Sequence, residues 1–259
     1  VTDPGHKRKD KPNQDDVLVL DGNLVLNHFP LLMVVDGMGG YEGGAVASRL
    51  VKESIAENYE RLSGSNTDIK AVLKYCIEQA HISLRSYAAE NPELGSMGCA
   101  LVIVVLTSDS VYVANVGDSR AYIFGLQKML QINYDHSEVA DLIRAGSLTP
   151  LQALRHPRRN RLTRSLSARR KNVEPFINRY DLLEDEVILL CSDGLWGVIS
   201  EAVLRAVVLE IQPQEAAEKL ITLARNFGGP DNISVAIACR KSTHLQLSQL
   251  GDDETNPGL

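Results

Sequence analysis

Five aspartates occupy similar positions in the sequence, each beside an apolar stretch of strand length. Asp36 follows the run LLMVV and precedes Gly37, Gly39 and Gly40. Aspartate is disfavoured inside strands, and glycine leaves the backbone open to close approach. The same combination of an apolar segment, an Asp and a nearby turn returns at four further positions, namely Asp15, Asp118, Asp193 and Asp231.

Such repetition predicts a metal site. If the strands share sheets, their carboxylates converge at one rim, where they remain ionised together only beside a cation. No His or Cys cluster accompanies them, and an all-oxygen set favours Mg²⁺ or Mn²⁺ over Zn²⁺. Two such ions can bridge a water, lower its pKa and clamp a phosphoryl group. Taken singly, Asp118 also fits an ordinary turn and residues 1–16 fit a solvated loop, so the prediction depends on the whole set.

The elements that must position these residues alternate between strands and helices. Short apolar runs rich in Val, Ile and Leu predict strands at 17–20, 24–26, 31–35, 99–106, 110–116, 120–124, 187–191 and 233–239. Helical spacing of apolar residues predicts helices at 45–61, 68–89, 139–144, 200–210 and 214–227. The three strands between 99 and 124 are separated by short turns, which predicts an antiparallel meander. The two long consecutive helices suit an antiparallel layer on a sheet.

Composition limits the class of protein. A chain of 259 residues that is 44% hydrophobic can bury a large core, and one domain is expected. Its net charge of −6 does not favour nucleic acid, no apolar run reaches membrane-spanning length, and no leader is evident. The four scattered cysteines are expected to be reduced core residues of a cytoplasmic protein. The first residue is Val and not Met, which is typical of a domain excised from a longer protein.

Residues 135–171 form the least regular segment, and its second half is strongly basic, with the sequence HPRRNRLTRSLSARRK. A run of charge is most often a solvated face. A long irregular stretch inside a compact domain is also typical of a functional flap, and arginines suit phosphate or acidic groups of a substrate.

Four motifs then occur in a characteristic order: DGMGG at 36–40, GDSR at 117–120, SDGLWG at 192–197 and GGPDNIS at 228–234. In this order and at these spacings the chain resembles the type 2C metal-dependent protein serine/threonine phosphatases. Its segments NQD at 13–15, DHS at 135–137 and LTP followed by HPRRNRLTRSL resemble the bacterial branch. The resemblance covers residues 3–239.

The resemblance implies an α+β fold, a four-layer α-β-β-α sandwich in which two antiparallel sheets are flanked by antiparallel helix pairs. It implies a catalytic domain at 1–240 with a substrate-gating flap at about 136–170, and it leaves 241–259 as a polar tail or linker. Two Mn²⁺ or Mg²⁺ ions are implied in the core site. Asp36 would bridge them, the Gly37 carbonyl would bind one ion, and Asp193 and Asp231 would bind the other.

Two further aspartates complete the implied site. Asp15 would hold metal-bound water, and Asp118, together with Asp193, would form a weaker third metal site. Members of the family usually carry a phosphate-binding Arg three residues before the Asn of NQD, where this chain has Asp10. Of the nearby cations Arg8 and Lys11, we expect Arg8 to replace it, because a guanidinium can grip phosphate through two hydrogen bonds.

Another departure concerns the leaving group. Met38 stands where eukaryotic members often have a His proposed as general acid, and Met cannot donate a proton, so a water must serve. The implied activity is direct hydrolysis of phosphoserine and phosphothreonine in proteins by a metal-bridging hydroxide, without a covalent intermediate. The implied partners are phosphoprotein substrates and a cognate Ser/Thr kinase, with no nucleic acid or membrane partner and a monomeric chain.

Two alternatives remain open at this point. A phosphatase-like scaffold or phosphoprotein-binding module without turnover would share the fold, although such a module is expected to lose metal aspartates and none is lost here. A sensor or output module of a longer chain would share the chemistry and differ only in context.

Overall fold

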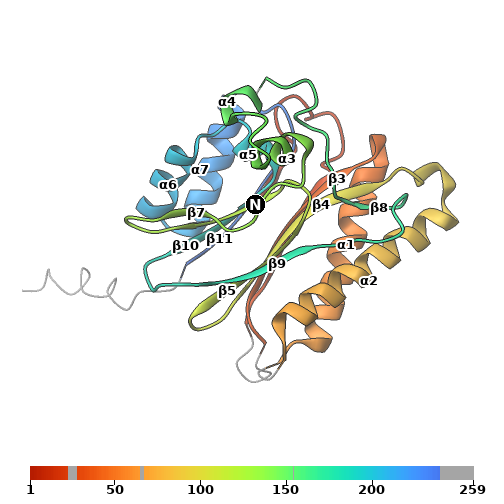
Figure 1. Cartoon of the computed structure of the whole chain (residues 1–259), viewed down its shortest axis with the longest axis horizontal. Helices are drawn as coiled ribbons and strands as arrows, with labels where there is room; N and C mark the ends of the chain where they lie inside the picture. The colour runs from red at the N-terminus through yellow and green to blue at the C-terminus, as the bar shows by residue number, and fades with distance from the viewer. Residues whose placement is uncertain (23–27, 65–66, 154, 240–259) are drawn as a thin grey trace, which may run out of the picture.

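The computed structural model describes residues 1–22, 28–64, 67–153 and 155–239. Two antiparallel β-sheets pack face to face, with a layer of helices on each outer side (Figure 1). The four-layer arrangement predicted from the sequence is confirmed. The expected strand at 24–26 and the expected tail at 241–259 lie outside the described residues.

The first sheet has five strands and the second has six, and every strand pair in them is antiparallel. In spatial order the first consists of β1 (Thr2–Asp3), β11 (Ile233–Cys239), β10 (Val187–Cys191), β6 (Arg120–Phe124) and β7 (Met129–Gln131). The second consists of β2 (Asp15–Leu20), β3 (Leu31–Met38), β4 (Gly98–Leu106), β5 (Ser110–Val116) and β9 (Phe176–Asp181), with the short β8 (Leu166–Ser167) paired to β4.

Each sheet is covered by one long helix pair. Helices α1 (Gly40–Leu62) and α2 (Ile69–Glu90) pack on the six-stranded sheet, while α6 (Glu201–Glu210) and α7 (Pro213–Asn226) pack on the five-stranded sheet (Figure 1). The shorter elements are η1 (Pro92–Leu94), α3 (Glu138–Arg144), α4 (Pro150–Ala153) and α5 (Asp193–Trp196). Among the described residues, no helix is both long enough and apolar enough to cross a membrane.

The strand β3 shows why its sequence is continuously apolar. Met33 and Val35 face the helices α1 and α2, whereas Leu32 and Val34 face the opposite sheet. Alternate side chains of a strand point to opposite faces, and both faces of this sheet are buried. The run therefore fills two core layers at once and ends at the rim where the polar residues begin.

Three predictions about these elements are wrong in detail. The strand predicted to end before Asp36 continues through Gly37 to Met38, because all three residues pair with β4. The predicted meander breaks after β5, since β6 lies in the other sheet and pairs with β10 and β7. Finally, Cys239 is exposed near the end of β11 and is not a core residue; the other three cysteines are free and buried.

The flap predicted at 136–170 contains α3, α4 and β8. Its base is attached to the six-stranded sheet, where Leu166 and Ser167 pair with β4. Within the flap, Ser137 forms an antiparallel bridge with Leu162. The strands β7 and β9, which flank this segment, are additional to those predicted.

Candidate active site

Asp15 and Asp36 lie opposite each other in register on the paired strands β2 and β3. Asp15 is only 6% exposed, and its Oδ2 accepts a hydrogen bond of 2.7 Å from Ser192 Oγ. Its Oδ1 is also buried and has no hydrogen-bond partner among the described residues. Because an unpaired buried carboxylate oxygen is costly, this atom marks a place for a cation or for water bound to one.

Gly37 leaves the backbone beside Asp36 bare. A Cβ at this position would lie 2.1 Å from the Gly44 carbonyl oxygen and 2.5 Å from that of Gln14, so no other residue fits. Its N–H donates to the Gln14 carbonyl at 3.0 Å, which fixes the local backbone. Gly37 lines the cleft described below, where a ligand can approach its main chain.

The five-stranded sheet supplies two more carboxylates. Asp193 begins α5 directly after β10, and Asp231 lies in the loop that leads into β11. The two strands pair antiparallel, so the end of β10 and the start of β11 are neighbours. Arg8 reaches this loop from the N-terminal segment, with Nη2 3.0 Å from Asp231 Oδ2. The loop is also held next to the start of β2, since the N–H of Gln14, the residue before that strand, donates to Asn232 Oδ1 at 3.0 Å.

Asp118 occupies the turn at which the chain crosses from β5 in one sheet to β6 in the other. Gly117 makes the turn possible, because it has φ of 115° and a Cβ there would lie 2.3 Å from the Ala100 Cβ. His136 holds Gly117 through two hydrogen bonds, one in each direction: the Gly117 N–H donates to Nδ1 at 3.1 Å, and the His136 N–H donates to the Gly117 carbonyl at 2.8 Å.

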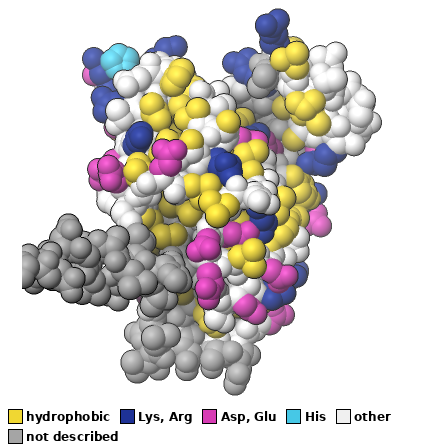
Figure 2. All heavy atoms as spheres, turned by 90° about the vertical axis from the view of Figure 1, so that its left-hand side faces the viewer, with side chains coloured by type: hydrophobic (Ala, Val, Ile, Leu, Met, Phe, Trp, Pro, Cys, Tyr) yellow, Lys and Arg dark blue, Asp and Glu magenta, His cyan; other side chains and the backbone are white. Residues whose placement is uncertain are grey.

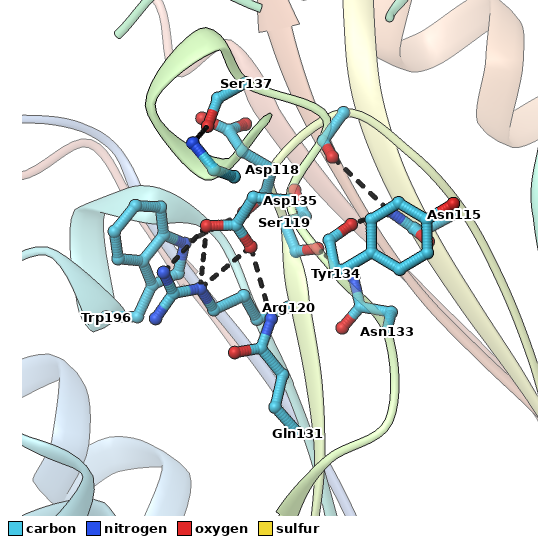
Figure 3. A network of polar contacts seen from close by, with 12 residues as sticks. Asn115, Asp118, Ser119, Arg120, Gln131, Asn133, Tyr134, Asp135, Ser137 and Trp196 are labelled. Atoms are coloured by element: carbon cyan, nitrogen blue, oxygen red, sulfur yellow. Dashed lines mark hydrogen bonds and ion pairs between the residues drawn. The ribbon is translucent and has the colours of Figure 1, made fainter. Parts of the chain in front are cut away.

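The Asp118 backbone is held from the other side by Trp196, whose Nε1–H donates to the Asp118 carbonyl at 3.0 Å. The Arg120 guanidinium carbon lies 3.7 Å from the centroid of the Trp196 ring. Asp135 grips Arg120 through hydrogen bonds at Nε and Nη2, the shortest being 2.7 Å (Figure 3). A buried network of charged and aromatic groups thus fixes the turn that carries Asp118.

The carboxyl groups of the site destabilise one another in their ionised forms. Burial raises the pKa of Asp36 well above its usual value, and the neighbouring charge of Asp15 raises it further. The pKa of Asp15 rises to about 7 and that of Asp118 to about 8, in both cases mainly through burial. Burial and the charge of Asp231 raise the pKa of Asp193 to about 6. A divalent cation would reverse this penalty by favouring the ionised forms.

These groups meet at a cleft of about 760 Å³. Its aspartates are Asp36, Asp118, Asp193 and Asp231, while Asp15 lies behind them, buried beside Asp36. No three His, Cys, Asp or Glu side chains in the described parts of the chain already form a compact metal-binding group. The oxygen donors that line the cleft suit Mg²⁺ or Mn²⁺ better than Zn²⁺, because these ions prefer carboxylate, carbonyl and water oxygens.

The structure brings together the residues predicted from the sequence. Arg8 and Lys11 both line the cleft beside the aspartates, and of the two only Arg8 contacts an aspartate of the set in the part of the chain that the structure describes. Sequence reasoning missed the supporting roles of Ser192 and Trp196. Both belong to the SDGLWG motif, so their nearness to Asp193 was the available signal, but their bonds to Asp15 and Asp118 cross between segments distant in the chain.

Comparison with known proteins agrees with this architecture. The family described as Protein phosphatase 2C matches residues 2–224. The chain is 34% identical over 228 residues to the serine/threonine phosphatase stp of Listeria innocua, covering 86% of this chain and 88% of that protein.

Two solved structures are similar over nearly the whole chain. The Mycobacterium tuberculosis serine/threonine phosphatase PstP/Ppp superposes with a TM-score of 0.84 and 29% identity, covering 93% of this chain and 97% of that one. The catalytic domain of PstP in complex with two manganese ions superposes with a TM-score of 0.80 and 28% identity, covering 92% and 94%.

The fold and its relatives together define a β-sandwich phosphatase, with a carboxylate-rich cleft lined by residues of both sheets. The chain belongs to the protein phosphatase 2C family.

Proposed function

We propose that this protein hydrolyses phosphoserine and phosphothreonine in proteins with the help of two bound Mn²⁺ or Mg²⁺ ions. The observation that carries the proposal is the convergence of four aspartates from both sheets on one cleft, with a fifth, Asp15, buried beside Asp36. Burial opposes the ionised forms of Asp15, Asp36, Asp118 and Asp193. Membership of a family of serine/threonine phosphatases supports the reaction, and the manganese complex of PstP supports the cofactor.

In this proposal Asp36, the Gly37 carbonyl, Asp193 and Asp231 would hold the two ions, with Asp36 shared between them. Asp118, together with Asp193, would hold a third and weaker ion. The position of Asp118 in the same cleft, at the crossing between β5 and β6, supports this role. The unpaired Oδ1 of Asp15 would accept a hydrogen bond from water bound to an ion at the site. When bound, such ions activate water and offset the charge of the phosphoryl group.

The protein's own side chains orient the substrate. Arg8, which pairs with Asp231 in this structure, would turn to the substrate phosphate when Asp231 binds an ion, because its planar guanidinium suits two phosphate oxygens. Lys11 is the second candidate on the same wall of the cleft. Met38 also lines the cleft and cannot donate a proton, so water protonates the leaving alkoxide.

The remaining assignments concern context. We propose that residues 1–240 form the catalytic domain and that the flap at 136–170 governs substrate access, a role supported by its position on one wall of the cleft. The protein acts as a monomer, since one chain supplies both walls, and a cognate Ser/Thr kinase produces its substrates. A cytoplasmic location in a signalling system fits its four free cysteines.

The test is phosphate release from a phosphothreonine peptide, measured with Mn²⁺, with Mg²⁺ and with EDTA. We expect metal-dependent release that Asp36→Ala and Asp193→Ala each reduce by at least 100-fold, the order of loss known for groups that stabilise a transition state. Asp185→Ala removes an exposed carboxylate from a turn outside the cleft and is the matched control. Absence of metal-dependent release, or full activity in Asp36→Ala, would refute the proposal. Tight metal binding without release would instead favour a phosphoprotein-binding module.

A further inference from the structure

The flap concentrates positive charge in a protein that is negative as a whole. Eight of the 27 Lys and Arg residues lie between positions 155 and 171, a stretch without any Asp or Glu, although the chain has a net charge of −6. Most of these side chains are exposed. Mutual repulsion among these cations destabilises the folded protein. Binding of a negatively charged ligand would explain why the stretch is nevertheless so basic.

One part of this basic stretch forms a wall of the catalytic cleft, which is lined there by Asn160, Arg161, Leu162 and Ser165. Hydrogen bonds hold this wall in place: the Glu138 N–H donates to the Arg161 carbonyl at 2.9 Å, and the Thr163 N–H donates to the His136 carbonyl at 2.8 Å. The Arg161 side chain is 67% exposed. The Arg161 guanidinium is therefore accessible to a ligand, while hydrogen bonds hold its backbone in place.

The opposite wall is also basic. Arg8, Lys11 and Pro12 line the cleft on that side, and Lys7 and Lys9 of the same loop are exposed. Figure 2 shows Lys and Arg side chains on both lobes that flank the hollow at the top of the molecule. A phosphorylated residue that reached the aspartate floor would thus have cations on either side of it.

Few acidic groups offset these cations, although Arg8 pairs with Asp231 at 3.0 Å. Glu138 pairs with Arg158 at 2.6 Å and with Arg161 at 3.4 Å, while Asp10 is the one acid within the basic N-terminal loop. Arg159 forms no ion pair with any residue that the structure describes. The flap wall therefore keeps an excess of positive charge toward solvent.

From these observations we infer that the two basic walls bind acidic residues flanking the phosphorylated residue, so that the substrates are acidic phosphoprotein segments. This inference rests on the proposed phosphatase function and specifies its substrate class. Binding through exposed charges adds modestly for each pair and is screened by salt. Several pairs acting together would make acidic flanks a selective feature.

The test compares two phosphothreonine peptides that differ only in their flanks, Asp and Glu in one and Asn and Gln in the other. We expect the acidic peptide to have a kcat/KM about 5- to 20-fold higher at 50 mM salt, mainly through a lower KM, since each exposed pair contributes about 1.5- to 5-fold. At 500 mM salt the ratio of the two kcat/KM values should approach one.

Arg159→Gln combined with Arg161→Gln should lower this ratio by about 2- to 10-fold. Arg158 still pairs with Glu138 in that variant, so the link across the flap remains. Arg61→Gln is the control, because Arg61 is an exposed residue in the last turn of α1, about 30 Å along the helix from the cleft. It removes the same kind of charge and should leave the ratio as it is in the unmodified protein.

A ratio near one in the unmodified protein, or a ratio that the double variant does not lower, overturns the inference while the phosphatase function stands. Hydrolysis of neither peptide refutes the phosphatase function. In that case the preference for acidic flanks is measured as the ratio of the dissociation constants of the two fluorescently labelled peptides. Equal dissociation constants overturn the inference as well.

Discussion

Replacing Asp193 by Asn should stabilise the metal-free protein at pH 8 while removing much of its response to metal. Burial and repulsion from Asp231 raise the pKa of Asp193 to about 6. Asn has nearly the same shape and carries no charge, so the variant avoids the cost of placing an ionised group there. Residues retained for function commonly lower stability in this way, and Asp193 is proposed to be one of them.

The sign and size of the effect follow from the pKa. In the unfolded chain Asp193 has its ordinary pKa of 3.8, and in the folded protein it has a pKa of about 6. The protonated Asp193 carboxyl therefore contributes to the free energy of unfolding. This contribution is complete below pH 4 and is lost as the pH rises through 6. Two pKa units correspond to about 3 kcal/mol, and partial solvent exposure lowers this to about 1–2 kcal/mol. For a chain of this size that is about 2–8 °C in melting temperature.

The assay is thermal unfolding in EDTA at pH 5 and pH 8, repeated with 1 mM Mn²⁺. We expect Asp193→Asn to melt higher than the unmodified protein at pH 8, to differ less at pH 5, and to gain less from Mn²⁺. Asp185→Asn, at an exposed position, should match the unmodified protein throughout. A variant that is less stable at pH 8 in EDTA, or equally stabilised at both pH values, would refute the electrostatic reasoning.

Two further predictions concern the turn that carries Asp118. Trp196→Phe keeps an aromatic ring beside Arg120 but removes the hydrogen bond to the Asp118 carbonyl. We expect the free energy of unfolding to fall by about 1 kcal/mol, or 2–4 °C in melting temperature, and half-maximal activity to need a higher Mn²⁺ concentration. An unchanged Mn²⁺ dependence would contradict the role assigned to this bond. Gly117→Ala combines positive φ with overlap on Ala100, whereas Gly146→Ala has positive φ and open space around the Cβ. Gly117→Ala should therefore lower the free energy of unfolding by at least 1 kcal/mol more than Gly146→Ala does, as measured by urea unfolding. Equal decreases in the two variants would contradict the close contact between Gly117 and Ala100 at the crossing from β5 to β6.

The layers of the fold could be predicted because local patterns determine them. The runs at 31–35 and 99–106 are apolar at every position, as strands buried on both faces must be, and the two long helices show clear spacing of apolar residues. The crossing between β5 and β6 could not be predicted from such patterns. A turn centred on Gly117 has the same local sequence character whether the next strand joins the same sheet or the opposite one, and long-range packing decides the outcome.

The aspartates were predictable because their repeated position beside apolar segments is visible in the sequence. Their supporting contacts were not. Ser192 and Asp15 are 177 residues apart, and Trp196 and Asp118 are 78 residues apart. A serine or tryptophan has no sequence signal that names a distant carboxylate or carbonyl as its partner, so these bonds emerge only from the packed structure.

The same long separations affect when the protein can become active during its synthesis. The cleft needs Asp15 and Gln14 from an early segment, and Gln14 is tied to Asn232, 218 residues later. At about 5–20 residues per second, a ribosome needs roughly 10–40 s to extend the chain from one to the other. A growing chain therefore cannot complete this cleft, or remove phosphate from neighbouring proteins, until almost the whole domain has left the ribosome.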